Sequence, residues 1–494
     1  MLHNMADQSQ LQKDSKIVII GAGVFGLSTT LHLLKRGYTN IHIFDRQPFD
    51  KNQYDERQGA HGASCDLNKI VRASYGGAKL YQDLAFKAMP EWERWNEQLA
   101  ATPKNELPSS IDPSIPLWHN CGFLRLSSDG FCEKEKQTQE LFPSEIRHTQ
   151  YRVSDAERRA RAAEEGIPFS KLDPFGRIER GQPVDGILDT TAGFVLASRA
   201  CAWALHLVLQ SGKVTTHFGA DNALQSFMKT GNRISGIVTS GFERHSADFV
   251  VVATGGWTPS LLPEVDRLLE TTSGSVLSIQ LPENRPDLWD KYSEDKFPVW
   301  SWNMESYDPS DKASIGGLYG LPRTPKGIVK IAFRGAKWTS YTRRSSVGEQ
   351  LSYPKIDADR IPEEAMRVIR EFARENLPDL LELDLSNIRL CWYTDSVDNS
   401  FLIDHVPNVE GLVVASGGSG HGFKFLPVLG EHIVDVIEKR DTEYTELFKW
   451  RDVPNGKRNG LEEGPEGWRP LDKQRMVGNK EWRNGLGVDG RSRL

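Results

Sequence analysis

The sequence KIVIIGAGVFG, residues 16–26, decides the fold class. It begins as a short apolar, β-branched run, which is typical of a strand buried on both faces, and it ends in a Gly-x-Gly-x-x-Gly pattern. Apolar residues at helical spacing follow over 27–35, and a second strand is expected over 41–44, ending at Asp45. Strand, glycine-rich turn, helix and strand together predict a βαβ unit.

The three glycines of this pattern predict a dinucleotide site. Gly21 permits the tight turn after the strand, Gly23 lets a pyrophosphate approach the backbone, and Gly26 lets helix and strand pack closely. The helix N-terminus offers free N–H groups and partial positive charge to the phosphates. Asp45 lies 19 residues after Gly26, where a carboxylate accepts hydrogen bonds from ribose hydroxyls. A glycine-rich turn without a ligand is the alternative.

Two later segments repeat the strand and glycine-rich turn. Residues 249–253 run into Thr-Gly-Gly-Trp, and residues 411–415 run into a glycine-rich loop over 416–420 and an apolar helix over 426–436. We expect these strands and the first one to lie side by side in one sheet. The position of the fingerprint near the N-terminus and the late glycine-rich loop favour FAD over NAD.

The remaining stretches are richer in Trp, Pro and charge, and they predict a second domain inserted into the first. The fold class is α/β (α+β), a Rossmann-like FAD-binding domain with an inserted substrate-binding domain of mixed antiparallel sheet and helices. The expected division is an FAD-binding domain over 1–89, 180–265 and 389–440, a substrate-binding domain over 90–179 and 266–388, and a C-terminal tail over 441–494.

Composition argues against several classes of partner. The net charge of −6 over 494 residues gives no reason to expect nucleic acid, and no apolar run is long enough to span a membrane. The five cysteines are scattered and odd in number, which argues against a disulfide framework and a metal site. The chain ends Ser492-Arg493-Leu494, a variant of the Ser-Lys-Leu peroxisomal address, so the peroxisomal import receptor is an expected partner. A cytoplasmic location is the alternative, and a monomer is expected.

Four blocks carry a resemblance to a known family. The chain resembles the sarcosine oxidase, pipecolate oxidase and fructosyl-amino-acid oxidase (amadoriase) group of flavin amine oxidases, in its fungal branch, from about residue 16 to 440. The blocks are Gly21–Gly26 with Asp45; Asp66-Leu-Asn-Lys-Ile-Val-Arg72 with Tyr75-Gly76; Cys391-Trp-Tyr-Thr-Asp395 with Phe401-Leu-Ile-Asp404; and Ser419-Gly-His-Gly-Phe-Lys-Phe425.

The resemblance implies a covalent flavin. The cysteine that Cys391 matches forms a thioether to the 8α-methyl group of FAD, whereas a lone cysteine is otherwise most often a buried structural residue. The residues expected to bind the cofactor are Gly21, Gly23, Val24, Phe25, Gly26, Asp45, Arg46, Ser64, Lys69, Gly255, Trp257, Cys391, Gly420, Gly422, Phe423 and Lys424.

The same resemblance assigns the substrate side. Arg72 and Lys424 are expected to bind the substrate carboxylate, Arg as a planar fork and Lys as a point charge. Tyr393 matches a tyrosine that lines the substrate pocket, and Lys69 matches a basic residue near the flavin ring. Lys330 falls on a lysine near flavin N5 that promotes reaction with oxygen, because a fixed positive charge stabilises superoxide as it forms. Ordinary solvated cations are the alternative reading.

The expected reaction is oxidation of a secondary amine, an N-methyl or N-alkyl amino acid, to an iminium that is hydrolysed or trapped by ring closure, with oxygen reduced to hydrogen peroxide. Fructosyl-amino-acid, pipecolate and saccharopine oxidase are alternatives, and so is a flavin dehydrogenase with a non-oxygen acceptor. Some fungal relatives act in secondary metabolism on aromatic substrates. Trp300, Trp302 and Trp338 either line a pocket for such a ring or belong to the core.

Overall fold

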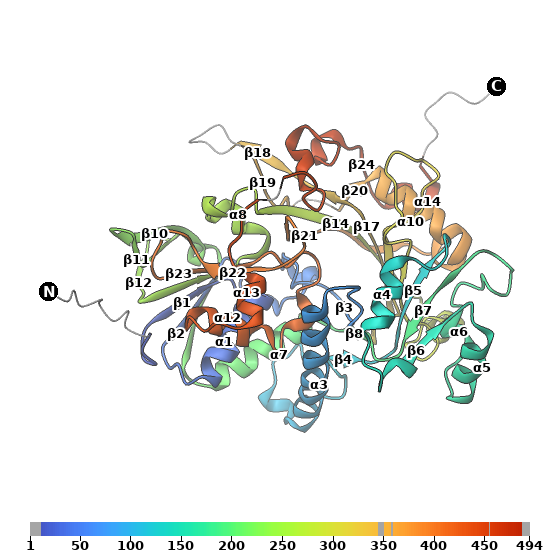
Figure 1. Cartoon of the computed structure of the whole chain (residues 1–494), viewed down its shortest axis with the longest axis horizontal. Helices are drawn as coiled ribbons and strands as arrows, with labels where there is room; N and C mark the ends of the chain where they lie inside the picture. Colours follow the sequence, from blue (N-terminus) through green and yellow to red (C-terminus); the bar gives the residue numbers. More distant parts are fainter. Residues whose placement is uncertain (1–10, 344–349, 357–358, 454, 487–494) are drawn as a thin grey trace.

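The computed structural model describes residues 11–343, 350–356, 359–453 and 455–486. Two large sheets dominate it, one mostly parallel and one mostly antiparallel (Figure 1). This mixed architecture confirms the predicted fold class. The expected peroxisomal address at Ser492–Leu494 lies outside the described residues and stays a prediction.

The first sheet has six strands, and all of its neighbouring pairs are parallel except the one that includes β22. The three segments expected to be neighbours are confirmed as such, because β1 pairs with β13 and β13 pairs with β23. In spatial order the strands are β22 (Leu402–His405), β23 (Leu412–Ser416), β13 (Phe249–Val252), β1 (Ile17–Ile20), β2 (Ile41–Asp45) and β9 (Val214–Phe218).

Both faces of this sheet are covered. Ile17 and Ile19 share a hydrophobic cluster with helices on one face, whereas Val18 and Ile20 share another with the small sheet β10–β12 on the opposite face. A strand buried on both faces is therefore apolar at every position, which explains the continuous run at residues 17–20. The covering elements are α1 (Val24–Lys35), α3 (Lys79–Ala101), α7 (Ala197–Gln210), α12 (Leu429–Ile437), β10 (Leu224–Thr230), β11 (Arg233–Thr239) and β12 (Arg244–Ser246).

The second sheet has eight strands, and only β15 and β5 pair in parallel. Helix α10 (Glu363–Asn376) packs on it, and the shared core includes Trp300, Trp302 and Trp338. These three side chains thus belong to the core rather than to a ligand pocket. In spatial order the strands are β21 (Leu385–Ser396), β14 (Leu269–Gln280), β17 (Ile328–Trp338), β16 (Leu318–Leu321), β15 (Val299–Trp302), β5 (Phe123–Ser127), β7 (Asp185–Asp189) and β6 (Gln150–Arg152).

The expected domain ranges and the sheets do not coincide at every strand. Strand β7 falls in a range expected for the FAD-binding domain, yet it lies in the eight-stranded sheet. A further small sheet orders β3 (Lys69–Val71), β8 (Gly193–Val195) and β4 (Trp118–His119). The division into two domains stays a proposal.

The described residues of the expected C-terminal tail pack against the rest of the protein. After α13 (Glu443–Phe448), strand β24 (Met476–Val477) pairs with β20 (Ile361–Pro362), and Trp482 of α14 (Asn479–Asn484) is fully buried against the eight-stranded sheet's core. The red segment in Figure 1 follows this path above β14 and β17.

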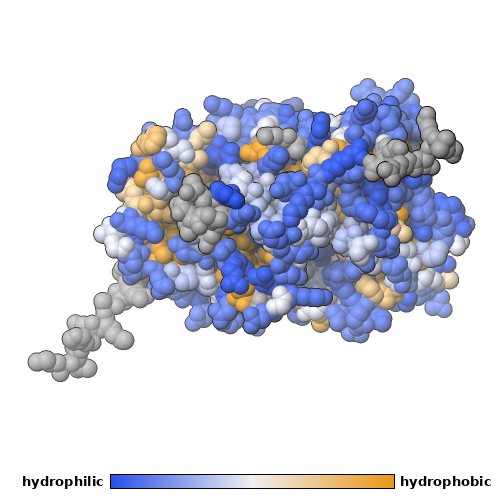
Figure 2. All heavy atoms as spheres, turned by 90° about the horizontal axis from the view of Figure 1, so that it is seen from above, coloured by the Kyte–Doolittle hydropathy of each residue, from blue (hydrophilic) through white to orange (hydrophobic). Residues whose placement is uncertain are grey.

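The face shown in Figure 2 is mostly hydrophilic, with hydrophobic residues in small groups. Within the described part of the chain, no helix combines the length and the apolar character needed to cross a bilayer.

Candidate active site

A cavity of about 940 Å³ lies where the two large sheets meet. Its wall includes the carboxyl-terminal ends of β1, β2 and β13 and the middle of β21. Ligands of open α/β sheets bind at the carboxyl ends of parallel strands, and this volume is at the upper end for cofactor sites.

The nucleotide end of the cavity is shaped by glycine. Gly21 has φ +106°, and a Cβ there would meet the carbonyl oxygen of Ala253 at 2.3 Å. A Cβ on Gly23 would lie 2.9 Å from Ser64 Oγ, and one on Gly26 would lie 1.8 Å from the carbonyl oxygen of Gly21. Gly21 and Gly23 therefore leave the backbone at the N-terminus of α1 free of side chains, and Gly26 allows the helix to pack closely against the strand. A turn of this shape fits a pyrophosphate.

Asp45 ends β2 at the same place. Its carboxylate accepts hydrogen bonds from the backbone N–H groups of Ala22 and Gln47, both at 2.8 Å. Burial raises the pKa of Asp45 to about 6, and the two N–H groups oppose this shift. The carboxylate is thus fixed at the cavity wall, in the position from which the Rossmann acid binds a ribose.

Cys391 lies in the cavity wall on β21, opposite Gly274 of β14. It is 6% exposed, and two cations donate to its sulfur: Lys69 Nζ at 3.7 Å and Arg389 Nη2 at 3.8 Å. The pairing with a glycine leaves room beside the thiol, so the position fits a covalent link to a cofactor in the cavity.

A buried network of charged side chains, centred on Asp66, includes both cations that contact this thiol. Asp66 is 1% exposed and forms ion pairs with Lys69 at 2.6 Å, Lys330 at 2.7 Å and Arg389 at 3.2 Å. Burial opposes ionisation, but these cations hold the pKa of Asp66 well below its usual range. Glu56 adds a second acid at 2.8 Å from Arg389.

Of the two lysines expected near the flavin ring, the structure brings Lys69 and not Lys330 to the cavity. Lys69 lines the wall, with its side chain 19% exposed. Lys330 is 1% exposed, is not part of the lining, and donates hydrogen bonds to Asp66 and to the carbonyl oxygen of Asn68 at 2.8 Å. Its charge therefore acts on the cavity through Asp66 and Lys69.

Arg72 and Lys424 lie together at another part of the wall. Lys424 donates to Tyr75 Oη at 3.0 Å and to the carbonyl oxygen of His421 at 2.8 Å, and Arg72 stacks over the Tyr75 ring at 4.7 Å. No carboxylate of the described residues lies within 4 Å of either cation. Burial first, and then Arg72 and Arg334, lower the pKa of Lys424 well below its ordinary value. An anionic ligand would stabilise the charged form of Lys424 and reduce its repulsion with Arg72 and Arg334.

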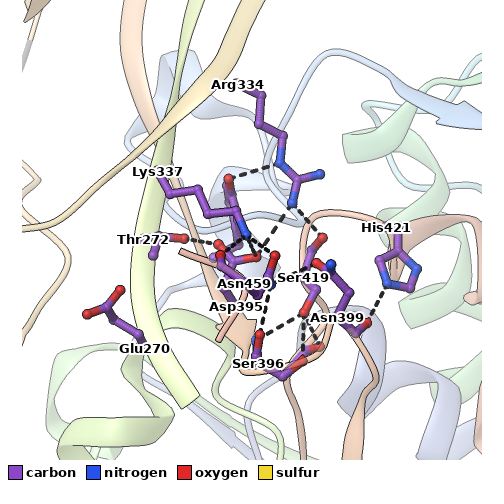
Figure 3. Close-up of polar contacts among 12 residues, drawn as sticks. Glu270, Thr272, Arg334, Lys337, Asp395, Ser396, Asn399, Ser419, His421 and Asn459 are labelled. Atoms are coloured by element: carbon purple, nitrogen blue, oxygen red, sulfur yellow. Dashed lines mark hydrogen bonds and ion pairs between the residues drawn. The ribbon is translucent and has the colours of Figure 1, made fainter. Parts of the chain in front are cut away.

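Arg334 is a cavity-lining residue that the sequence reading missed. It lies on β17 four residues after Lys330, and its Nε donates to Tyr393 Oη at 3.2 Å. Figure 3 shows the Arg334 side chain above Ser419. Residues i and i+4 of a strand share a face, so the expectation that Lys330 faces the flavin was the available signal for Arg334.

Nearly all predicted residues reach the cavity. Lys330 does not, and Gly26 acts by packing beneath the turn. No group of three His, Cys, Asp or Glu side chains suited to a metal occurs in the described residues. The lining contains Gly21, Gly23, Val24, Phe25, Asp45, Arg46, Ser64, Lys69, Arg72, Gly255, Trp257, Cys391, Tyr393, Gly420, Gly422, Phe423 and Lys424.

Comparison with known proteins agrees with this geometry. A family model described as FAD dependent oxidoreductase (DAO) matches residues 16–436. The chain is 27% identical to L-saccharopine oxidase of Schizosaccharomyces pombe (88% of this chain, 93% of the relative) and 24% identical to peroxisomal sarcosine oxidase of Homo sapiens (86% and 93%). Fructosyl peptide oxidase from E. terrenum has the same fold, with a TM-score of 0.74 at 22% identity over 94% of this chain and 98% of that one.

Proposed function

The chain belongs to the DAO family of FAD dependent oxidoreductases, and from this premise we propose that it oxidises a secondary amine bearing a carboxylate, an N-methyl or N-alkyl amino acid, with oxygen as acceptor. Its relatives are oxidases of amino acids and amines. FAD, when bound, would supply the redox chemistry: it would accept the C–H hydrogen beside the amine nitrogen together with its electron pair, and oxygen would then take two electrons and two protons to give hydrogen peroxide.

One observation carries the choice of a carboxylate-bearing substrate. Lys424 is buried and Arg72 is half-buried in the cavity wall, and no carboxylate of the described residues is within ion-pair distance of either. Buried charges are normally paired, so these two require a negative group from a ligand. The substrate carboxylate would accept hydrogen bonds from both, which orients the carbon beside the nitrogen towards the cavity wall that holds Cys391. The names of the two relatives, saccharopine and sarcosine oxidase, support a secondary amine.

Removing the Lys424 ammonium tests this assignment. A panel of N-methyl amino acids, followed by peroxide formation, first identifies the fastest substrate. For Lys424→Met we expect kcat/KM for that acid to fall about 10- to 100-fold, because a charge-assisted hydrogen bond is lost, while kcat/KM for the corresponding carboxamide changes little. Lys424→Arg should retain part of the discrimination. Lys449→Met, at an exposed lysine that does not line the cavity, is the control. Equal losses for the acid and the carboxamide would contradict a carboxylate contact.

Lys69 offers a separate test of oxygen as the acceptor. We expect Lys69→Met to slow the reaction of the reduced holoenzyme with oxygen about 10- to 100-fold, since it removes the positive charge that lies beside Cys391 in the cavity wall. Lys330→Met should slow it less, because that ammonium is held by Asp66. Stopped-flow mixing of the anaerobically reduced protein with oxygen measures both rates. Slow reoxidation of the wild type, combined with rapid reduction of a quinone dye, would favour the dehydrogenase alternative.

A further inference from the structure

Arg334 adds a positive charge to the part of the cavity near the carboxylate pair, Arg72 and Lys424, and a carboxylate bound by that pair does not account for it. Its side chain is 23% exposed and lines the cavity. Nε donates to Tyr393 Oη at 3.2 Å, and Nη2 donates to the carbonyl oxygen of Ser419 at 2.6 Å. Within the described ranges, no residue accepts a hydrogen bond from Nη1. A guanidinium has five N–H donors, so this edge is available to a ligand.

The guanidinium of Arg334 is fixed by contacts on the side that faces away from its Nη1 atom. Figure 3 shows it beside Ser419 and Asp395, and Asp395 Oδ1 lies 3.5 Å from Nη2. A Cβ on Gly420 would meet the guanidinium at 2.3 Å, so the glycine-rich loop lies directly against it. A donor that is already fixed loses little entropy on binding a ligand.

The negative charge of Asp395 is shared between Arg334 and a second cation, Lys337. The same carboxylate lies 3.4 Å from Lys337 and accepts a hydrogen bond from Thr272 Oγ1 at 2.5 Å. Lys337 is fixed in turn by the tail, donating to the carbonyl oxygen of Asn459 at 2.8 Å and to its Oδ1 at 2.6 Å (Figure 3). Two cations thus share one carboxylate, and a net positive charge remains on the cavity side.

We propose that Arg334 binds a second carboxylate of the substrate, so that the site takes an N-alkyl amino acid with a carboxylate on each side of the amine nitrogen. This inference rests on the proposed function and names its substrate class. Arg72 and Lys424 bind the carboxylate of the amino acid, and Arg334 binds the carboxylate of the N-alkyl group. A single carboxylate would leave like charges facing one another in a buried site, whereas a dicarboxylate balances both positions.

The test compares ligands that differ in one carboxylate. Binding of glutarate and of butyrate to the holoenzyme is followed through the flavin absorption spectrum. We expect the wild type to prefer glutarate about 10- to 100-fold, the range for one charge-assisted hydrogen-bonded contact. In Arg334→Gln this preference should fall to about threefold or less, with butyrate binding unchanged, and Arg334→Lys should retain part of it. Lys337→Gln is the matched control, because Lys337 also contacts Asp395 but does not line the cavity; its preference should stay within about threefold of wild type.

Kinetics with N-(2-carboxyethyl)-L-alanine and N-propyl-L-alanine complete the test. We expect Arg334→Gln to lower kcat/KM for the first compound about 10- to 100-fold more than for the second. Equal losses for both compounds, or an unchanged glutarate preference, would overturn the role of Arg334 while leaving an active amine oxidase. Failure of the wild type to oxidise any secondary amine would instead reject the proposed function, and the glutarate preference would still report on Arg334.

Discussion

Acid precipitation of the wild-type holoenzyme is expected to leave the yellow flavin colour in the pellet, whereas Cys391→Ala is expected to release it entirely into the supernatant. Cys391 is the thiol in the cavity wall that lies beside both Lys69 and Arg389. A thioether survives unfolding in acid, but contacts of the kind made by the glycine turn and Asp45 are lost when the protein unfolds. The absorbance of pellet and supernatant near 450 nm therefore separates attached from merely bound flavin.

A second thiol in the same cavity provides the matched control. Cys132 is exposed and also belongs to the lining, so Cys132→Ala should behave as the wild type. Cys391→Ala should still bind added FAD, because the nucleotide end of the cavity is unchanged. Release of the colour from the wild type would show that Cys391 forms no link, and release from Cys132→Ala alone would move the link to that residue.

The nucleotide end was predictable from sequence because its determinants are local. Gly21, Gly23, Gly26 and Asp45 all belong to one βαβ unit. Glycines at this spacing indicate a tight turn and a close approach of the backbone to a ligand, and the acid indicates a ribose contact. The parallel neighbours β13 and β23 were predictable for a related reason, since a strand buried on both faces is recognisable as a continuous apolar run.

The charges at the amine end depend on contacts between distant segments. Strand alternation shows that Lys330 and Arg334 share a face of β17, but not that one side chain meets Asp66, 264 residues earlier, while the other reaches the cavity. Resemblance placed Lys330 near the flavin; the structure places its ammonium on Asp66, and its role in oxygen reactivity stays a prediction. Trp300, Trp302 and Trp338 could not be assigned to core or pocket from sequence for the same reason. The hydrophobic pattern of a strand does not show whether a helix or a cavity covers each face.

Asp66→Asn should destabilise the protein by about 3 to 5 kcal/mol, the range for removing one partner of a buried ion pair. Asp66 is almost completely buried between Lys330, Lys69 and Arg389. Among the residues that the structure describes, only Arg389 of these three cations has a second acid, Glu56, at ion-pair distance. The asparagine has nearly the same shape, so packing is preserved while the cations lose their negative partner. Urea unfolding of the holoenzyme, followed by tryptophan fluorescence, measures the change.

The pH dependence and a double variant identify charge as the cause. The folded-state pKa of Asp66 is depressed, so its stabilisation is complete above the unfolded value of about 3.9 and is lost as the pH falls below it. The difference between wild type and Asp66→Asn should therefore shrink in acid. Adding Lys330→Met removes one unpaired cation and should restore about 1 to 2 kcal/mol. Asp398→Asn, at an exposed ion pair with Arg451, should change stability by about 1 kcal/mol or less. A similarly small effect of Asp66→Asn would mean that water or a neighbouring group compensates these cations, and that the thiol and Lys69 are not held in place by this network.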